Sequence, residues 1–209
     1  MILNKIKNKI HFQLVKNKFS EFKGIDGWLT ENEALGLFYY SSLLPPHSVV
    51  VEIGTWKGKS TYCIAKGLKS GNIFSIDPFD ASGEEESAVI YNERKGTSSL
   101  LDQFESRMKQ LGVFEKITPM KGLSTQFVGK FQSIDFLFID GDHSIEGCDF
   151  DFTNFANFLK VGGFIAFHDF DESRDELGPT WVIKNKVLTS RNYKFENLYN
   201  SLWIARKIA

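Results

Sequence analysis

The stretch VVVEIGTWKGKST, residues 49–61, decides the fold of this chain. It begins with a short apolar run, passes through two glycines, and continues into a helical pattern from about Lys59 to Leu68. A buried strand that leads through a glycine turn into a helix is typical of a parallel sheet flanked by helices. The stretch therefore predicts an α/β fold whose first strand ends at this glycine loop.

Apolar runs and helical patterns alternate along the rest of the chain. We expect strands at residues 49–53, 72–76, 116–120, 134–139, 164–167, 193–198 and 201–206. We expect helices at residues 30–44, 59–68, 98–111, 145–159 and 181–188. Only two residues separate the last two strands, so they form a hairpin and the last strand enters antiparallel. The pattern predicts a doubly wound, mostly parallel seven-stranded sheet with an antiparallel last strand.

Composition sets the outer limits of function. The chain has 209 residues, of which 42% are hydrophobic and 24% charged, with a formal net charge of −1. These values suit one globular domain and exclude a disordered or collagen-like chain. A nearly neutral surface also argues against a nucleic-acid partner. The longest uncharged run, residues 34–51, contains Pro45 and Pro46, so we expect no transmembrane segment.

The N-terminus carries a local excess of positive charge. Isoleucine or leucine recurs there every fourth residue, at Ile2, Ile6, Ile10 and Leu14, with lysines between. This spacing predicts a basic amphipathic helical arm over residues 1–26, followed by the catalytic domain, residues 27–209. Such an arm can pack on its own domain, on a second copy in a homo-oligomer, or weakly on an anionic membrane surface. It lacks the apolar core of a secretory signal, so we expect a cytoplasmic protein.

The ends of the first two strands indicate a nucleoside ligand. Gly54 and Gly58 allow a close turn, but their spacing matches neither the dinucleotide pattern G-x-G-x-x-G nor an ATP-binding phosphate loop. Asp77, at the end of the second strand, is placed to accept the hydroxyls of a ribose. Glu52 suits a cationic amino group better than a pyrophosphate. The sequence therefore favours an adenosine ligand that carries an ammonium and a sulfonium.

The chain resembles the class I S-adenosylmethionine-dependent methyltransferases, and more narrowly the small bacterial group similar to antibiotic-sugar and polysaccharide O-methyltransferases. The resemblance extends from Gly27 to the C-terminus and is carried by GWLT (27–30), VEIGTWKGKST (51–61), FIDGDHS (138–144) and GGFIAFHD (162–169). It implies a Rossmann-like fold with S-adenosyl-L-methionine as cofactor. The implied cofactor contacts are Glu52, Gly54, Thr55 and Ser60 at the methionine part, Asp77 at the ribose, Ser124 beside the adenine, and Asp140. Alternatively, Ser60 and Ser124 only cap helices.

Acidic and imidazole groups follow two further strands. Asp140, Asp142 and His143 come after one apolar strand, and His168 and Asp169 after the next, so these side chains should converge at one edge of the sheet. Such a cluster can bind a divalent cation or supply a general base near neutral pH.

The resemblance assigns roles within this cluster. It implies His143 as general base, with Asp140 and Asp169 as its catalytic partners, and a metal at Asp140, His168 and Asp169. Similar enzymes carry a carboxylate at the position of His168. The imidazole makes magnesium a poorer fit, and it favours manganese or no metal.

The functional hypothesis is O-methylation of a sugar hydroxyl or of another small polar acceptor. The polar stretch 79–95 is expected to cover the cofactor site as a lid, and residues 171–180 to form another wall. Two alternatives stay open. A non-catalytic cofactor-binding or interaction protein would not need the histidine-aspartate cluster. A metal-dependent hydrolase using His143, His168 and Asp169 would not need an adenosine pocket.

Overall fold

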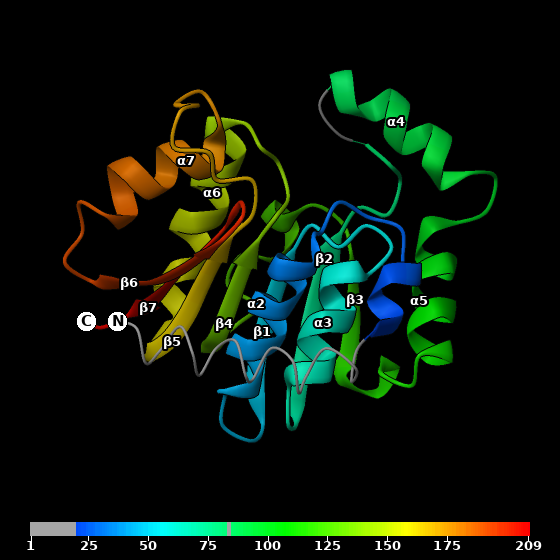
Figure 1. Cartoon of the computed structure of the whole chain (residues 1–209), viewed down its shortest axis with the longest axis horizontal. Coiled ribbons are helices and arrows are strands. Elements are labelled where there is room, and N and C mark those ends of the chain that lie inside the picture. The colour runs from blue at the N-terminus through cyan, green and yellow to red at the C-terminus, as the bar shows by residue number, and fades with distance from the viewer. Residues whose placement is uncertain (1–19, 83–84) are drawn as a thin grey trace.

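A seven-stranded sheet with the strand order β3-β2-β1-β4-β5-β7-β6 forms the centre of the molecule (Figure 1). The computed structural model describes residues 20–82 and 85–209. The strands are β1 (Ser48–Ile53), β2 (Gly71–Asp77), β3 (Ile117–Lys121), β4 (Ile134–Ile139), β5 (Leu159–Phe167), β6 (Tyr193–Tyr199) and β7 (Leu202–Lys207). The first five pair in parallel, whereas β7 runs antiparallel to both β5 and β6. The predicted doubly wound sheet and its antiparallel last strand are confirmed.

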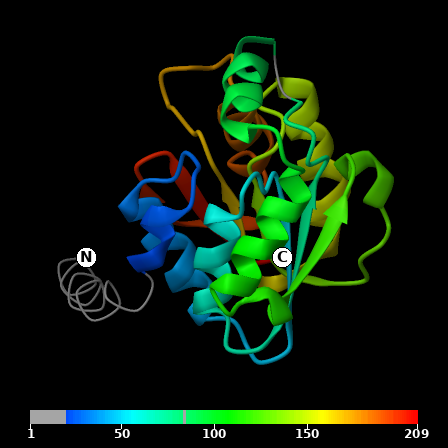
Figure 2. The same ribbon diagram turned by 90° about the vertical axis from the view of Figure 1, so that its right-hand side faces the viewer.

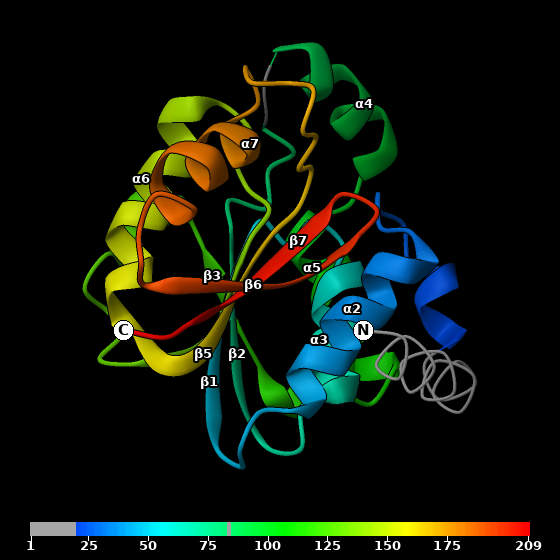
Figure 3. The same cartoon turned by 60° about the vertical axis from the view of Figure 1, so that its left-hand side comes forward.

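Helices cover both faces of the sheet (Figure 3). α2 (Glu31–Ser42), α3 (Lys59–Gly67) and α5 (Leu100–Gln110) lie on one face, and α6 (Ile145–Phe155) and α7 (Gly178–Val182) lie on the other. Two apolar cores result, one around Leu37, Tyr62 and Phe104, the other around Cys148 and Phe155. Every residue of β4 is buried, as expected for a central strand covered on both sides.

The polar stretch that follows β2 contains a helix that the sequence pattern does not predict. This helix, α4 (Glu85–Lys95), stands at the end of the molecule where the parallel strands finish (Figure 2). Val89 is 63% exposed and Ile90 is 48% exposed, so residues 89–95, the part of α4 whose side chains are described, turn no continuous apolar face toward a core. Without such a face, the sequence of this segment shows no helical periodicity of apolar residues, although it contains alanine, arginine and lysine, which favour helix.

The N-terminal arm lies mostly outside the described residues. Its predicted amphipathic helix cannot be compared with the structure, and the domain boundary at residue 27 stays a prediction. Of the described part of the arm, η1 (Ser20–Gly24) packs its Phe22 into the same core as Leu37. Within residues 20–82 and 85–209, no helix is both long enough and apolar enough to cross a membrane.

Candidate active site

A large open cavity of about 1550 Å³ lies at the carboxyl ends of the parallel strands. Its wall is built by the loops that follow the first five strands, as expected for a doubly wound sheet. Nearly all the predicted site residues line this cavity: Gly54, Thr55, Ser60, Asp77, Ser124, Asp140, His143, His168 and Asp169. The structure therefore brings the predicted cofactor contacts and the predicted catalytic cluster into one space.

Gly54 brings the loop after β1 against the loop after β4. Its φ is +86°, and a Cβ at this position would lie 1.9 Å from the carbonyl oxygen of Asp140. The amide of Asp140 donates a hydrogen bond to the carbonyl of Ile53 at 2.8 Å, and this bond also holds the two loops together. Because only glycine fits this conformation and this space, the residue keeps the two loops in register at the cavity.

Asp77 holds the glycine loop through its carboxylate. Its Oδ2 accepts hydrogen bonds from the amides of Thr55 and Trp56, both at 2.9 Å, and its Oδ1 accepts one from Phe79 at 2.6 Å. Burial raises the pKa of Asp77, while these three amides oppose that shift. The residue thus fixes the loop and also borders the cavity at the position expected for a ribose.

Glu52 lies beneath the same loop and does not line the cavity. Its side chain is fully buried and accepts hydrogen bonds from four hydroxyls, those of Ser60 (2.6 Å), Thr61 (2.5 Å), Ser75 (3.0 Å) and Thr55 (3.2 Å). Burial raises the pKa of Glu52 to about 7, although the hydroxyls lower it. In this arrangement the carboxylate ties the loop to α3 and β2, and its predicted contact with an ammonium group stays a prediction.

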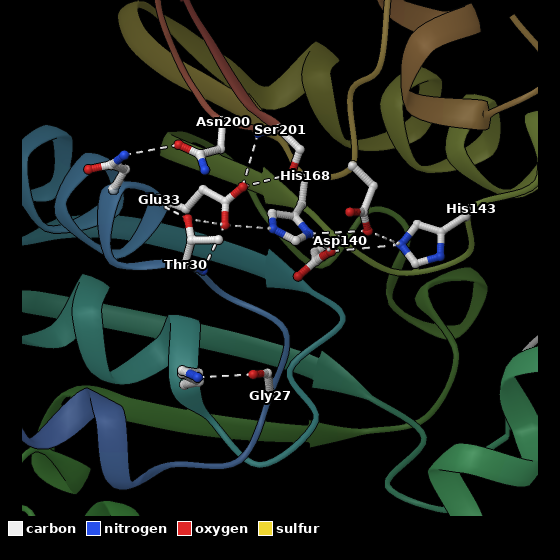
Figure 4. Close-up of polar contacts among 11 residues, drawn as sticks. Gly27, Thr30, Glu33, Asp140, His143, His168, Asn200 and Ser201 are labelled. Atoms are coloured by element: carbon white, nitrogen blue, oxygen red, sulfur yellow. Dashed lines mark hydrogen bonds and ion pairs between the residues drawn. The ribbon is translucent and has the colours of Figure 1, made fainter. Parts of the chain in front are cut away.

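The acids and histidines after β4 and β5 form one connected network (Figure 4). His168 Nδ1 lies 3.1 Å from Asp140 Oδ1 and 3.2 Å from Asp169 Oδ2. His143 Nε2 lies 3.1 Å from the same Asp169 oxygen and 3.8 Å from Asp140 Oδ1. Asp169 has a φ of +56°, a left-handed conformation that aspartate tolerates better than most residues. The predicted convergence of these side chains is confirmed.

Glu33 completes the network and was missed by the sequence reasoning. It is 2% exposed, and its Oε2 lies 3.5 Å from His168 Nε2. The amide and hydroxyl of Thr30 donate to Oε2, at 2.8 and 2.7 Å, and those of Ser201 donate to Oε1, at 3.0 and 2.7 Å. In the sequence, a glutamate three residues after Thr30 matches a capping box at the start of a helix, and this match fully explains Glu33. Its second role depends on the β6–β7 turn and on β5, both distant in the chain, so no local signal reveals it.

The network alternates negative and positive groups. Hydrogen bonds to Asp140 and Asp169 raise the pKa of His143 to about 10. Burial alone would lower the pKa of His168, but Asp140, Asp169 and Glu33 raise it well above its usual value. Burial would likewise raise the pKa of Glu33, but His168 and Thr30 lower it to about 2. At neutral pH both imidazoles of the free protein are therefore in the cationic, protonated form, and Glu33 and Asp169 are ionised.

One group of side chains in the described residues is arranged as metal ligands could be. It consists of Asp140, His143 and Asp169, whose candidate ligand atoms lie within 4.8 Å of one another. The sequence reasoning selected His168 in place of His143. His168 does face the same two carboxylates through Nδ1, while its Nε2 faces Glu33. Oxygen and imidazole ligands together suit manganese or zinc better than magnesium.

An aromatic cluster forms the wall of the cavity beneath α4. Trp28, Trp56 and Tyr91 come from three separate segments, and their ring centroids lie 5.1 to 5.7 Å apart. Asp26 forms ion pairs with Lys57 at 3.1 Å and with Arg94 of α4 at 3.2 Å. These contacts attach α4 to the glycine loop, so this helix is a wall of the cavity.

The fold and this site define a methyltransferase of the Rossmann-like class, and comparison with known proteins agrees. The family model described as "Methyltransferase domain" matches residues 51–170, which is more than half of the chain. The chain belongs to this family, and the resemblance to class I S-adenosylmethionine-dependent methyltransferases is confirmed.

Solved structures of methyltransferases share the fold. The O-methyltransferase NovP superposes with a TM-score of 0.68 at 10% identity, over 97% of this chain and 100% of that one. An O-methyltransferase from Bacillus cereus in complex with S-adenosylhomocysteine has a TM-score of 0.65 at 14% identity, over 96% and 97% of the two chains. At such low identity these likenesses show the fold alone.

A curated relative comes from Acanthamoeba polyphaga mimivirus. This uncharacterized protein, R132, is 33% identical over 126 residues, which cover 59% of this chain and 52% of the relative. The chain thus spans about half the length of this curated relative.

Proposed function

We propose that the chain is an S-adenosylmethionine-dependent O-methyltransferase that acts on a hydroxyl of a sugar or of another small polar acceptor. One observation carries the proposal: the glycine loop held by Asp77 and the cluster of His143, Asp140 and Asp169 border the same cavity. A metal-dependent hydrolase would require the cluster of histidine and aspartates but not the glycine loop. A protein that only binds the cofactor would require the glycine loop but not the cluster. We further propose residues 27–209 as the methyltransferase domain.

The cavity residues fit the proposed cofactor group by group. Gly54, Thr55 and Ser60 border the space for the methionine part, above the buried carboxylate of Glu52. In this proposal the ribose lies beside Asp77 and the adenine beside Ser124, two residues that border the cavity. When bound, the cofactor supplies an electrophilic methyl group on a sulfonium.

His143 would accept the proton of the acceptor hydroxyl. The bound cofactor would supply its methyl group to the acceptor oxygen by in-line displacement, with the thioether as leaving group, and the His143 imidazole would take the hydroxyl proton. Asp169, 3.1 Å from His143 Nε2, stabilises the imidazolium that forms. Because the pKa of His143 is about 10 in the free protein, only its minor neutral form can accept a proton at pH 7. Turnover should therefore increase toward alkaline pH.

A divalent cation is a second element that the geometry can accommodate. Asp140 and Asp169 would hold it together with an imidazole, either that of His168 or that of His143. Such an ion would lower the pKa of an acceptor hydroxyl. If His143 acts as the base, its imidazole must not bind the ion, so His168 would be the imidazole ligand. Loss of activity on exhaustive EDTA treatment and its restoration by manganese would support a bound cation, whereas full activity after EDTA treatment would exclude a role for one.

The proposed acceptor is consistent with the outer part of the cavity. The rings of Trp28, Trp56 and Tyr91 offer faces on which the apolar side of a sugar ring can pack, and Asn200 and Ser201 border the cavity near His168. A small-molecule or glycan acceptor fits such a wall.

The test of the proposed function separates binding from chemistry. His143→Ala should bind S-adenosylhomocysteine with unchanged affinity and lose methyl transfer to sugar acceptors, followed by product mass spectrometry. Asp142→Asn is a matched control in the same loop, because the Asp142 carboxylate accepts a hydrogen bond from the Ser144 amide at 2.8 Å and the proposal gives it no part in proton transfer. Unchanged turnover in His143→Ala would remove the assignment of the base. Loss of cofactor binding would place His143 in the cofactor site instead.

A further inference from the structure

One carboxylate in the cavity wall has no role in the chemistry described above. Asp151 lies on α6, is 2% exposed and borders the cavity. Its Oδ1 is buried and has no hydrogen-bond partner among the described residues. An unpaired buried carboxylate oxygen is costly to a fold, so a native structure that retains one pairs it with water, an ion or a ligand, or uses it in function.

The neighbours of Asp151 place it beside the space proposed for the adenine. A Cβ on Gly141 would lie 3.5 Å from Asp151 Oδ2, so the carboxylate packs against the loop that follows β4. The hydroxyl of Ser124, which follows β3, lowers the pKa of this side chain. Burial outweighs that contact and raises the pKa of Asp151 to about 6. The carboxylate therefore lies between the two loops that border the base.

We propose that Asp151 recognises the adenine of the cofactor by accepting a hydrogen bond from its 6-amino group. This inference rests on the proposed function, because it requires an adenosine ligand in the cavity. The 6-amino group is the hydrogen-bond donor that distinguishes adenine from a 6-oxo purine, which presents an acceptor there. A carboxylate accepts from an amine and repels a carbonyl oxygen, so Asp151 would select adenine and reject 6-oxo bases.

The experiment measures how much affinity the 6-amino group contributes. Calorimetry compares S-adenosylhomocysteine with its analogue in which hydrogen replaces the 6-amino group, for the wild type and for Asp151→Ala. The wild type should prefer the amino compound about 10- to 100-fold, the value expected for one hydrogen bond to a charged group. Asp151→Ala should bind both compounds equally. Asp151→Asn keeps an acceptor oxygen and should retain part of the preference.

Asp149→Asn is the matched control on the same helix. Asp149 pairs with Lys186, accepts from Thr153 at 3.3 Å and does not border the cavity, so its variant should keep the full preference. If Asp151→Ala retains the wild-type preference, the inference is wrong while the proposed function stands. If the folded wild type binds neither compound, the proposed function fails and the inference fails with it. If the variants do not fold, equal binding of both compounds by the wild type alone overturns the inference.

Discussion

The buried carboxylate of Glu52 makes stability depend on pH in a way that one substitution should remove. Its pKa is about 7 in the folded chain, against an ordinary value of 4.5. The folded state therefore binds this proton more tightly than the unfolded state does. The resulting stabilisation is fully present below pH 4.5 and is lost as the pH rises through 7.

The size of this pH-dependent loss of stability follows from the shift in the pKa of Glu52. One pKa unit corresponds to about 1.4 kcal/mol, so between pH 5 and pH 8 Glu52 should remove about 2.5 kcal/mol from the free energy of unfolding. Glu52→Gln is neutral at every pH and cannot contribute to this loss. Its amide oxygen can replace one of the two carboxylate oxygens and still accept the hydroxyls that bond there, either Ser60 at Oε1 or Thr61 and Ser75 at Oε2.

Urea unfolding of both proteins at pH 5 and pH 8 measures the effect. Other titrating groups contribute equally to both, so they cancel when the pH dependence of the variant is subtracted from that of the wild type. Glu105→Gln, which breaks only the surface pair with Lys109, should behave as the wild type. If Glu52→Gln loses as much stability between the two pH values as the wild type does, the account of a buried carboxylate with a raised pKa is refuted.

Three further predictions concern the loops and the catalytic network. Gly54→Ala should lower the free energy of unfolding by about 4 kcal/mol, because the new Cβ would meet the carbonyl of Asp140. Gly162 also has a positive φ, +90°, but open space surrounds it, so Gly162→Ala should lower the free energy of unfolding by only about 1 kcal/mol. Urea titration distinguishes the two, and equal losses would contradict the proposed contact. Glu33→Gln removes the anion opposite His168 and should lower the free energy of unfolding at pH 7 by about 2 kcal/mol. This difference from the wild type should shrink at pH 3, because the wild type loses the stabilisation from Glu33 as the pH falls from 4.5 toward 2. A variant as stable as the wild type at pH 7 would refute this role of Glu33. The rate of methyl transfer should rise about tenfold per pH unit from pH 6 to 9, because His143 must lose its proton first, and a profile that is flat there would exclude it as the base.

Much of the fold could be predicted because the sequence carries it locally. The glycine loop after β1 and the capping box that begins α2 were each readable from a few adjacent residues, and the structure has both. The exception is α4: in its residues 89–95, Ile90 and Tyr91 line the cavity and most of the other side chains are exposed to solvent, so no apolar period marks this part of the helix.

The site could be predicted only in part. Asp140, His143, His168 and Asp169 follow apolar strands, and parallel strands carry such residues to one edge of the sheet. Glu33 and Asp151 could not be predicted in this way. They lie on helices, and their roles depend on packing against distant segments, namely the β6–β7 turn for Glu33 and the loop after β3 for Asp151.

Calorimetric titration of the folded protein with S-adenosylhomocysteine tests the central claim most directly. We expect one site per chain with micromolar affinity, and weaker binding when Asp77 is replaced by Ala. We expect no binding of NAD or ATP, because the loop after β1 lacks the glycine patterns that bind them. If the folded protein releases no heat with S-adenosylhomocysteine, and the compound does not raise its melting temperature, the cavity is not a cofactor site and the account is wrong.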